Sequence, residues 1–254
     1  MITTVLFDMG GTLEDIWVDE ESERKAIETL KDMLIRFGLN PNCDYETLKQ
    51  RVDQGWAEYS LVRDKTNVEQ KPVEIWCNYA LKAFDFPREQ LSVHCEEIAH
   101  MWEITHYHRR IRPRVKEMLE GLKALGLKLG VISNTAALFQ VFDTLEEYGI
   151  RDLFSDVTLS SVTGMRKPGT DIFTVSLRQM QSKPEECVYV GDTVSRDVIG
   201  SKRAGFAAAI QIASKLTQEK DANIHREYEP DYVIADIYDV LPTVAKMLSE
   251  NAPA

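Results

Sequence analysis

The stretch that decides the fold is Val5-Leu6-Phe7-Asp8-Met9-Gly10-Gly11-Thr12. Its three apolar residues predict a short buried strand, and Gly-Gly-Thr then turns the backbone sharply away. This turn presents Asp8 at the end of the strand, where its carboxylate is placed to act as a nucleophile. Two residues later, where a second carboxylate would serve as a proton donor, the chain has Gly10. The loop therefore offers a nucleophile without an acid/base partner beside it.

The composition describes an acidic globular protein. The chain has 254 residues, of which 44% are hydrophobic and 28% charged, and its formal net charge is −11. This length suits one sizeable domain, or a core with a smaller insert. The negative charge argues against a nucleic-acid partner, which would need a basic face, and weakly against an anionic membrane surface. No apolar stretch approaches the roughly 20 residues that a spanning helix needs, and the N-terminus does not resemble a secretory signal.

The cysteines predict a reducing compartment. They are widely scattered and include no C-x-x-C pair, so they are interpreted as packing residues rather than as zinc ligands or disulfides. We therefore expect a cytoplasmic protein. The four positions are Cys43, Cys77, Cys95 and Cys187.

About a hundred residues after the first strand are predicted to be all-helical. Apolar residues recur there at helical spacing, which indicates helices with one buried face. Four helices with facing apolar stripes can form a small bundle. The four stretches are 26–37, 45–59, 73–84 and 91–102.

From Pro113 onward, predicted strands alternate with predicted helices. Such alternation implies an α/β fold with a mainly parallel sheet covered on both faces. The first strand belongs to this sheet, so the helical segment is an insertion just after it. A polar stretch at 214–230 is predicted to be a loop, followed by a short strand and a final helix. The predicted strands are 2–8, 127–133, 157–160, 187–190, 206–212 and a short one near Val233.

Polar side chains follow four of these strands. Ligands of an open parallel sheet bind at the carboxyl ends of the strands, so we expect these side chains to lie together. One nucleophilic carboxylate, one hydroxyl, one lysine and two further carboxylates suit the handling of a phosphoryl group with a hard cation. They are Asp8, Ser133 in Ser133-Asn134-Thr135, Lys167 in Arg166-Lys167-Pro168, and Asp192 and Asp197 in Gly191-Asp192-Thr193-Val194-Ser195-Arg196-Asp197.

With these motifs in this order, the chain resembles a hydrolase of the haloacid dehalogenase (HAD) superfamily with a helical cap inserted after the first motif. Any one motif arises by chance, whereas four in order on an alternating α/β background are specific. The resemblance implies a Rossmann-like three-layer catalytic core over residues 1–14 and 112–254. It also implies an all-helical cap domain over residues 15–111, which opens and closes over the site to exclude water and select the substrate.

The resemblance implies a role for each motif residue. Asp8 would attack phosphorus and form an aspartyl-phosphate. Ser133 and Asn134 would bind phosphoryl oxygens, and Lys167 would offset their charge and keep Asp8 ionised. Arg166 is expected to be a solvated neighbour of Lys167. Mg²⁺ is the implied cofactor, and its ligands would be Asp8, the backbone carbonyl of Gly10, Asp192 and Asp197, the last in the first or second shell.

Gly10 departs from the pattern of the family phosphatases, which place an aspartate there as acid and base. General acid/base help contributes typically about 10²–10⁴-fold, and an alkoxide leaving group needs it most. The chain would therefore act on a substrate with a good leaving group, such as an acyl or aryl phosphate, or use a substitute acid. Glu14, Asp15 and groups from the cap are the candidates.

Three functions stay open on this reading. The first is a Mg²⁺-dependent, phosphatase-like hydrolase of a small phosphorylated or activated metabolite. The second is a different reaction of the same nucleophile, as in a phosphonatase-like C–P hydrolase. A dehalogenase is disfavoured, because dehalogenases lack the metal site that Asp192 and Asp197 would form. The third is a HAD-fold binding protein with little or no turnover. The second function requires a cap lysine able to form a Schiff base, with candidates Lys31, Lys49, Lys65, Lys71 and Lys82.

Two residues outside the motifs are predicted to bind the substrate. Trp17 lies a few residues past the nucleophile loop, although a packing or hinge role suits it equally. Arg63 lies in a polar stretch of the helical segment, where a solvated position is the alternative. The basic run 109–112 could also meet an anionic substrate, but a solvated basic face is the commoner outcome for such a run.

Overall fold

The computed structural model describes residues 1–214, 217, 221–222 and 224–250. Within them, six strands form a sheet in the order β5-β4-β1-β6-β7-β8, and every neighbouring pair is parallel. The central strands are buried along their whole length, as expected for a parallel sheet covered on both faces. The strands are β1 (Thr4–Phe7), β4 (Lys128–Ser133), β5 (Asp156–Leu159), β6 (Cys187–Gly191), β7 (Ala208–Ile212) and β8 (Tyr232–Ile234).

Helices cover both faces of the sheet, which confirms the predicted α/β fold. On one face, apolar side chains of α6 (Val115–Ala124), α7 (Gln140–Glu147) and α12 (Val240–Glu250) pack against the sheet. On the other face lie α9 (Thr170–Met180) and α10 (Ile199–Arg203). Short helical turns complete the connections: η3 (Arg151–Leu153), α8 (Ser160–Thr163), η4 (Pro184–Glu186), η5 (Val194–Val198) and η6 (Ile237–Asp239).

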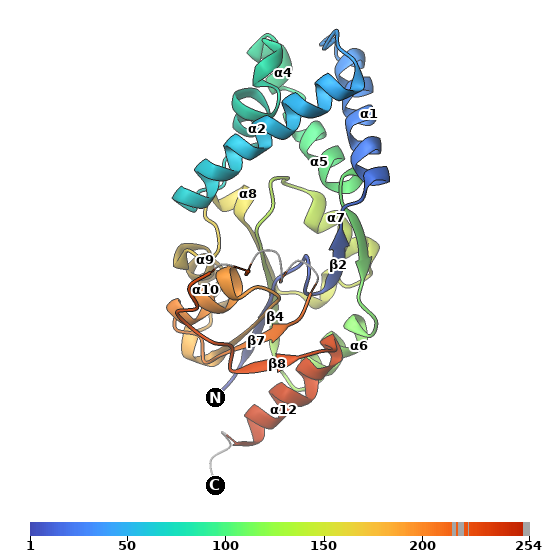
Figure 1. Cartoon of the computed structure of the whole chain (residues 1–254). Helices are drawn as coiled ribbons and strands as arrows, with labels where there is room; N and C mark the ends of the chain where they lie inside the picture. Colours follow the sequence, from blue (N-terminus) through green and yellow to red (C-terminus); the bar gives the residue numbers. More distant parts are fainter. Residues whose placement is uncertain (215–216, 218–220, 223, 251–254) are drawn as a thin grey trace.

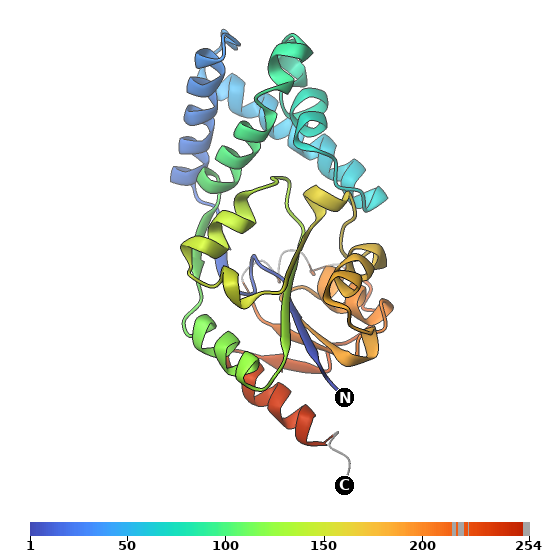
Figure 2. The ribbon, with the colours of Figure 1, turned by 180° about the vertical axis from the view of Figure 1, so that it is seen from behind.

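The segment inserted between β1 and α6 is mainly helical and lies at one end of the sheet domain (Figures 1 and 2). It has its own apolar core. Its first two predicted helices form as expected. The third is a short α-helix that continues into π and 3₁₀ turns, and the fourth is divided in two. Gly55 lets the second helix approach the π turn, because a Cβ there would lie 2.3 Å from the carbonyl oxygen of Tyr79. The elements are α1 (Glu20–Arg36), α2 (Tyr45–Thr66), α3 (Pro72–Ile75), η1 (Trp76–Ala80), η2 (Lys82–Phe84), α4 (Arg88–Ser92) and α5 (Cys95–Thr105).

A two-stranded ribbon joins the helical segment to the sheet domain. Its strands, β2 (Glu14–Trp17) and β3 (His108–Ile111), pair antiparallel, and the Trp17 ring stacks on that of His108 at 5.1 Å. The sequence pattern predicts no strand at either position. The expectation of a solvated face at 109–112 is wrong for Arg109. This side chain is only 13% exposed and lies between Glu14 and Glu103.

Two further features bear on the sequence predictions. Within the described part of the chain, no helix combines the length and the apolar character needed to cross a membrane.

The four cysteines, all described, are free thiols. Of the predicted loop at 214–230, residues 215–216, 218–220 and 223 lie outside the described residues.

Candidate active site

Asp8 stands at the carboxyl end of β1 with its side chain fixed in place. Its Oδ1 accepts a hydrogen bond from the backbone N–H of Met9 at 2.7 Å and lies 2.8 Å from Nζ of Lys167. The turn that follows requires glycine at position 11, where φ is +87°. A Cβ on Gly11 would lie 2.3 Å from Oδ2 of Asp192. The glycine therefore allows the nucleophile loop to pack directly against a second carboxylate.

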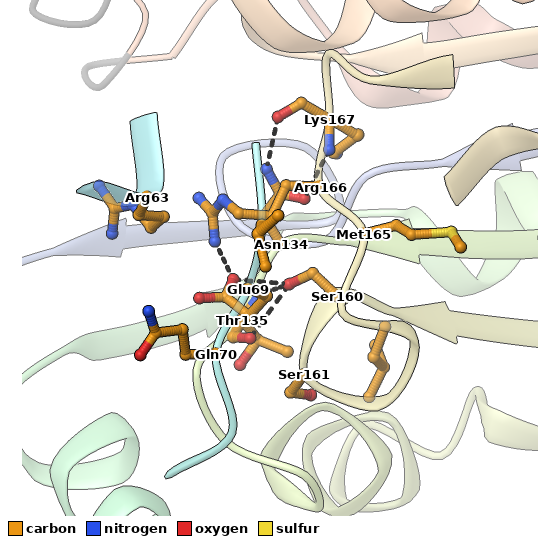
Figure 3. A network of polar contacts seen from close by, with 12 residues as sticks. Arg63, Glu69, Gln70, Asn134, Thr135, Ser160, Ser161, Met165, Arg166 and Lys167 are labelled. Atoms are coloured by element: carbon orange, nitrogen blue, oxygen red, sulfur yellow. Dashed lines mark hydrogen bonds and ion pairs between the residues drawn. The ribbon is translucent and has the colours of Figure 1, made fainter. Parts of the chain in front are cut away.

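Lys167 is a buried ammonium group held by oxygen atoms on several sides. Besides Asp8, its Nζ contacts Oδ1 of Asp197 at 2.7 Å and Oη of Tyr189 at 2.9 Å. The side-chain amide of Asn134 fixes its backbone (Figure 3), since Oδ1 accepts from the Lys167 N–H at 3.0 Å and Nδ2 donates to the Lys167 carbonyl at 3.1 Å. The Asn134 side chain thus positions Lys167 rather than pointing freely at a phosphoryl group.

Three carboxylates meet at this point and form a candidate metal centre. One oxygen from each of Asp8, Asp192 and Asp197 lies within 4.8 Å of the others. Oδ1 of Asp192 is buried and accepts no hydrogen bond from the described residues. Both oxygens of Asp197 are engaged, Oδ1 by Lys167 and Oδ2 by the N–H and hydroxyl of Thr193. This oxygen-only donor set suits a hard cation such as Mg²⁺, and the unpartnered Asp192 oxygen is free to bind one.

The carboxylates of this cluster titrate differently. Burial raises the pKa of Asp8, and the nearby Lys167 opposes that effect. Burial, reinforced by the charges of Asp197 and Asp8, raises the pKa of Asp192 to about 6. Burial also acts to raise the pKa of Asp197, but Lys167 and Arg196 outweigh it and hold the pKa below its usual value. Burial thus disfavours the ionised forms of Asp8 and Asp192, and a cation bound between them would stabilise those forms.

A cavity of about 790 Å³ opens above Asp8, between the sheet domain and the helical segment. Of the predicted site residues, Asp8, Gly10, Ser133 and Asn134 line it from the sheet side, together with Trp17 and Arg63. Lys167, Asp192 and Asp197 do not line it but lie buried beside Asp8. Arg166, which was expected to be solvated, also lines the cavity. Lining residues that the sequence did not mark as part of the site include Trp56, Glu69, Trp102, Glu103 and Arg196.

The prediction that Arg166 is a solvated neighbour of Lys167 is wrong. Arg166 is buried and not solvated, because it forms an ion pair with Glu69 from the loop after α2 (Figure 3). Glu69 also accepts hydrogen bonds from the hydroxyls of Tyr59 and Ser160, the latter at 2.8 Å. The Glu69 N–H donates to the carbonyl of Gly164 at 2.9 Å. This network attaches the helical segment to the loop that carries Lys167.

Neither candidate for a substitute acid in the loop faces the cavity. Glu14 is fully buried, with Oε1 2.5 Å from Nη1 of Arg109 and Oε2 accepting from the hydroxyl of Tyr148 at 2.8 Å. Asp15 lies at the surface beside Arg112, at 3.3 Å. Glu14 nevertheless lies close to the position of the missing aspartate, because a Cβ on Gly10 would be 3.9 Å from its Oε1.

Comparison with known proteins agrees with this geometry. The sequence pattern of the haloacid dehalogenase-like hydrolases matches residues 2–205. The chain belongs to this family of hydrolases. Among solved HAD-like structures, it superposes on a 2-haloacid dehalogenase from Pseudomonas syringae pv. Tomato with a TM-score of 0.70 and 22% identity, covering 97% of this chain and 100% of the other. A HAD phosphatase from Thermococcus onnurineus gives a TM-score of 0.61 at 22% identity, with coverages of 96% and 98%. These likenesses show the fold.

The chain is also similar in sequence to proteins named as phosphatases. The chain is 36% identical to a glyceraldehyde 3-phosphate phosphatase of Methanothermobacter thermautotrophicus over 243 residues, which cover 93% of this chain and 97% of that one. It is 29% identical to a glyceraldehyde 3-phosphate phosphatase of Methanocaldococcus jannaschii over 253 residues, with coverages of 97% and 99%. Both alignments include the helical insertion as well as the HAD core.

Proposed function

We propose that this protein is a Mg²⁺-dependent phosphatase of a small phosphorylated metabolite, working through an aspartyl-phosphate on Asp8. The observation that carries the proposal is the contact of Asp8 with Lys167 at the floor of a cavity, with Asp192 beside it. A fixed carboxylate, a buried cation and a second carboxylate in one place suit phosphoryl transfer, which depends chiefly on positioning and charge stabilisation. The named activity of the relatives supports the same reaction.

The reaction has two displacement steps. In the first, an Asp8 oxygen forms a bond to phosphorus while the bond from phosphorus to the leaving oxygen breaks. In the second, water attacks phosphorus, inorganic phosphate leaves and the Asp8 carboxylate is restored. Ser133 lines the cavity and donates its hydroxyl to a phosphoryl oxygen, while Lys167 offsets the negative charge on the transferred group.

Mg²⁺ would be held by Asp8, Asp192 and the backbone carbonyl of Gly10. When bound, it supplies positive charge that screens the carboxylates from the incoming phosphoryl group. Asp197 contributes by holding Lys167, because both of its oxygens already accept hydrogen bonds. Asn134 acts in the same way through the backbone of Lys167. The residues 15–111, joined through the ribbon and the Glu69 network, serve as the cap.

Gly10 shapes the choice of substrate. Since neither Glu14 nor Asp15 lines the cavity, the loop provides no side chain to protonate a leaving alkoxide. A substrate whose leaving group is stable as an anion, such as an acyl phosphate, avoids this requirement. The phosphonatase alternative is disfavoured, because no lysine among the described residues lines the cavity and a Schiff base would need one.

The test is hydrolysis of glyceraldehyde 3-phosphate, p-nitrophenyl phosphate and acetyl phosphate with and without Mg²⁺. We expect Mg²⁺-dependent turnover that favours acetyl and aryl phosphate and is lost in Asp8→Asn. Asp15→Asn is the matched control, because this carboxylate lies at the surface and outside the cavity. Absence of turnover on every substrate by the folded wild type would contradict the proposal and favour a binding protein. Equal loss in both variants would contradict the assignment of the nucleophile.

A further inference from the structure

Among the described residues, four arginines line the cavity, and two of them are neutralised by buried carboxylates. Arg109 lies between Glu14 at 2.5 Å and Glu103 at 2.7 Å. Arg166 forms its ion pair with Glu69. A buried charge is stable only when it is paired and hydrogen-bonded, and these two cations meet that condition within the protein.

Arg63 and Arg196 lack such a partner. Arg63, on α2, forms its ion pair with the neighbouring Asp64 at 2.9 Å, and the Asp64 side chain is 66% exposed. A solvated pair of this kind neutralises little charge. The Arg63 guanidinium also lies over the ring of Tyr59, which carries no charge to neutralise it. Arg196, on η5, forms no ion pair with the described residues, and its Nε is buried without a hydrogen-bond partner among them. An unsatisfied buried donor is costly, so an oxygen ligand at this position would remove a penalty.

Both side chains line the same cavity, Arg63 from α2 and Arg196 from η5. Burial lowers the pKa of Arg166 to about 9, and the charges of Arg63 and Arg196 contribute to the lowering. The guanidinium groups of Arg63, Arg166 and Arg196 therefore interact electrostatically. Glu69 pairs with Arg166, and the charge of Arg196 also acts on the nearby carboxylates of Asp8, Asp192 and Asp197. Neither Arg63 nor Arg196 has a buried ion-pair partner of its own among the described residues, so these two side chains supply the charge that would attract an anion.

The transferred phosphoryl group does not account for this charge. Ser133 and Lys167 already serve it beside Asp8 in the proposed reaction, and the cavity of about 790 Å³ has room for considerably more than one phosphate group. Arginine is suited to a second group of this kind, because its planar fork binds carboxylate and phosphate oxygens in pairs.

We propose that Arg196, together with Arg63, forms a subsite for a second anionic group of the substrate, a carboxylate or a second phosphate. This inference rests on the proposed phosphatase function, and it predicts a preference, among phosphates with comparable leaving groups, for metabolites that carry a second anionic group. A substrate bound in this way bridges Arg63 of the cap and Arg196 of the core, so that its second anion also favours the closed position of the cap.

The test compares substrates that differ in the second anion alone. Comparing kcat/KM for phosphoglycolate with that for ethyl phosphate tests whether the subsite binds a carboxylate. Comparing 1,3-propanediol bisphosphate with propyl phosphate tests whether it binds a second phosphate. A charge-assisted hydrogen bond in a partly buried site corresponds to about 10- to 100-fold in affinity. We expect wild-type kcat/KM to favour the doubly anionic member of at least one pair by about this factor, and the pair that responds identifies the anion.

Variants assign the preference to the two arginines. In Arg196→Ala and Arg63→Ala, the ratio of kcat/KM within the responsive pair should fall toward one. Arg196→Lys should restore part of it, because the charge returns without the planar fork. Arg36→Ala is the matched control, since Arg36 lies in the same helical segment at 62% exposure, away from the cavity. It should leave the ratio unchanged.

Three outcomes would overturn the inference. One is a wild-type ratio near one for both pairs. Another is equal slowing of both members of a pair in Arg196→Ala, which would assign this arginine to the transferred phosphoryl group. If the wild type hydrolyses none of the phosphates, the proposed function fails, and calorimetric binding of the same pairs to the Mg²⁺-loaded protein then decides the subsite. If the two members of each pair bind with equal affinity, the proposed subsite for a second anion is rejected.

Discussion

Glu69 and Arg166 form a buried ion pair across the boundary between the helical segment and the sheet domain (Figure 3). Arg166 immediately precedes Lys167, so the pair connects the helical segment to the ammonium group that contacts Asp8. The β2–β3 ribbon carries both covalent connections between the two parts, whereas this pair is a contact made in space. The two parts are thus joined both by the chain itself and by buried contacts around Glu69.

Breaking this pair should be costly. Glu69→Gln keeps the shape of the side chain but leaves Arg166 without a counter-charge, and breaking a buried ion pair typically costs about 3–5 kcal/mol. We expect the melting temperature to fall by on the order of 10 °C, with a lower kcat/KM. Glu97→Gln is the control, because its pair with Arg36 is exposed on both sides and should contribute about 1 kcal/mol or less. Similar shifts in the two variants would contradict a special role for the buried pair.

Neighbouring glycines in the nucleophile loop should respond differently to the same substitution. Gly11→Ala places a Cβ 2.3 Å from Oδ2 of Asp192 at a left-handed φ, whereas a Cβ on Gly10 meets nothing closer than 3.6 Å. We expect Gly11→Ala to weaken Mg²⁺ binding by about 10- to 100-fold, because Asp192 must move. Gly10→Ala should bind Mg²⁺ almost as the wild type does. Calorimetric titration with Mg²⁺ measures both, and equal affinities would argue against Asp192 as a ligand.

Metal binding should depend on pH through Asp192. Burial and the charges of Asp197 and Asp8 raise its pKa to about 6, so a proton competes with the cation below that pH. We expect the Mg²⁺ dissociation constant to rise by about tenfold per pH unit below 6. An affinity that stays constant between pH 5 and pH 7 would contradict this assignment.

Asp192 should also make the stability of the metal-free protein depend on pH. Its contribution to the free energy of unfolding should fall as pH rises, whereas Mg²⁺ affinity should increase. The folded pKa of Asp192 is raised above its ordinary value of 3.8, so its contribution is fully present below pH 3.8 and is lost as pH rises through about 6. Asp197, whose pKa is lowered, acts in the other direction. Subtracting the stability profile of Asp192→Asn from that of the wild type isolates the Asp192 contribution. Without Mg²⁺, the difference in the free energy of unfolding between the two proteins should decline as pH rises from 3.8 to about 6. With saturating Mg²⁺, we expect no such decline.

The site residues that follow directly from a predicted strand could be placed from the sequence. The apolar runs before Asp8, Ser133 and Asp192 predict buried strands, and the parallel-sheet rule then brings their carboxyl ends together. The structure brings Asp8, Lys167, Asp192 and Asp197 into contact as this reasoning expected. Asp8 directly follows β1, Asp192 and Asp197 follow β6, and Lys167 follows β5 after the short helix α8. Their placement therefore needs no knowledge of distant pairing.

Residues whose partners are distant in the chain were not predictable. Arg109 appears as part of a basic run, and its burial depends on Glu14, 95 residues away. Arg166 depends on Glu69, 97 residues away. Trp17 and His108 carry no alternating pattern that marks a strand, and their ribbon forms only when the two ends of the insertion meet. The charge of a side chain is visible in the sequence, whereas its partner and its burial belong to the fold.

Gly10→Asp should improve hydrolysis of substrates with poor leaving groups. The backbone at Gly10 has no left-handed φ, and a Cβ there meets Ile16 at 3.6 Å and Oε1 of Glu14 at 3.9 Å, which are ordinary contacts. The negative charge of Glu14 would raise the pKa of the introduced carboxyl group and favour its protonated form, the form that can donate a proton to a leaving alkoxide. We expect turnover of ethyl phosphate to rise, by up to about 10²–10⁴-fold, with little change for acetyl phosphate. Gly10→Asn, of the same size and without the acid, should show no such gain. A folded Gly10→Asp variant with unchanged or slower ethyl phosphate hydrolysis would mean that leaving-group protonation does not limit this enzyme.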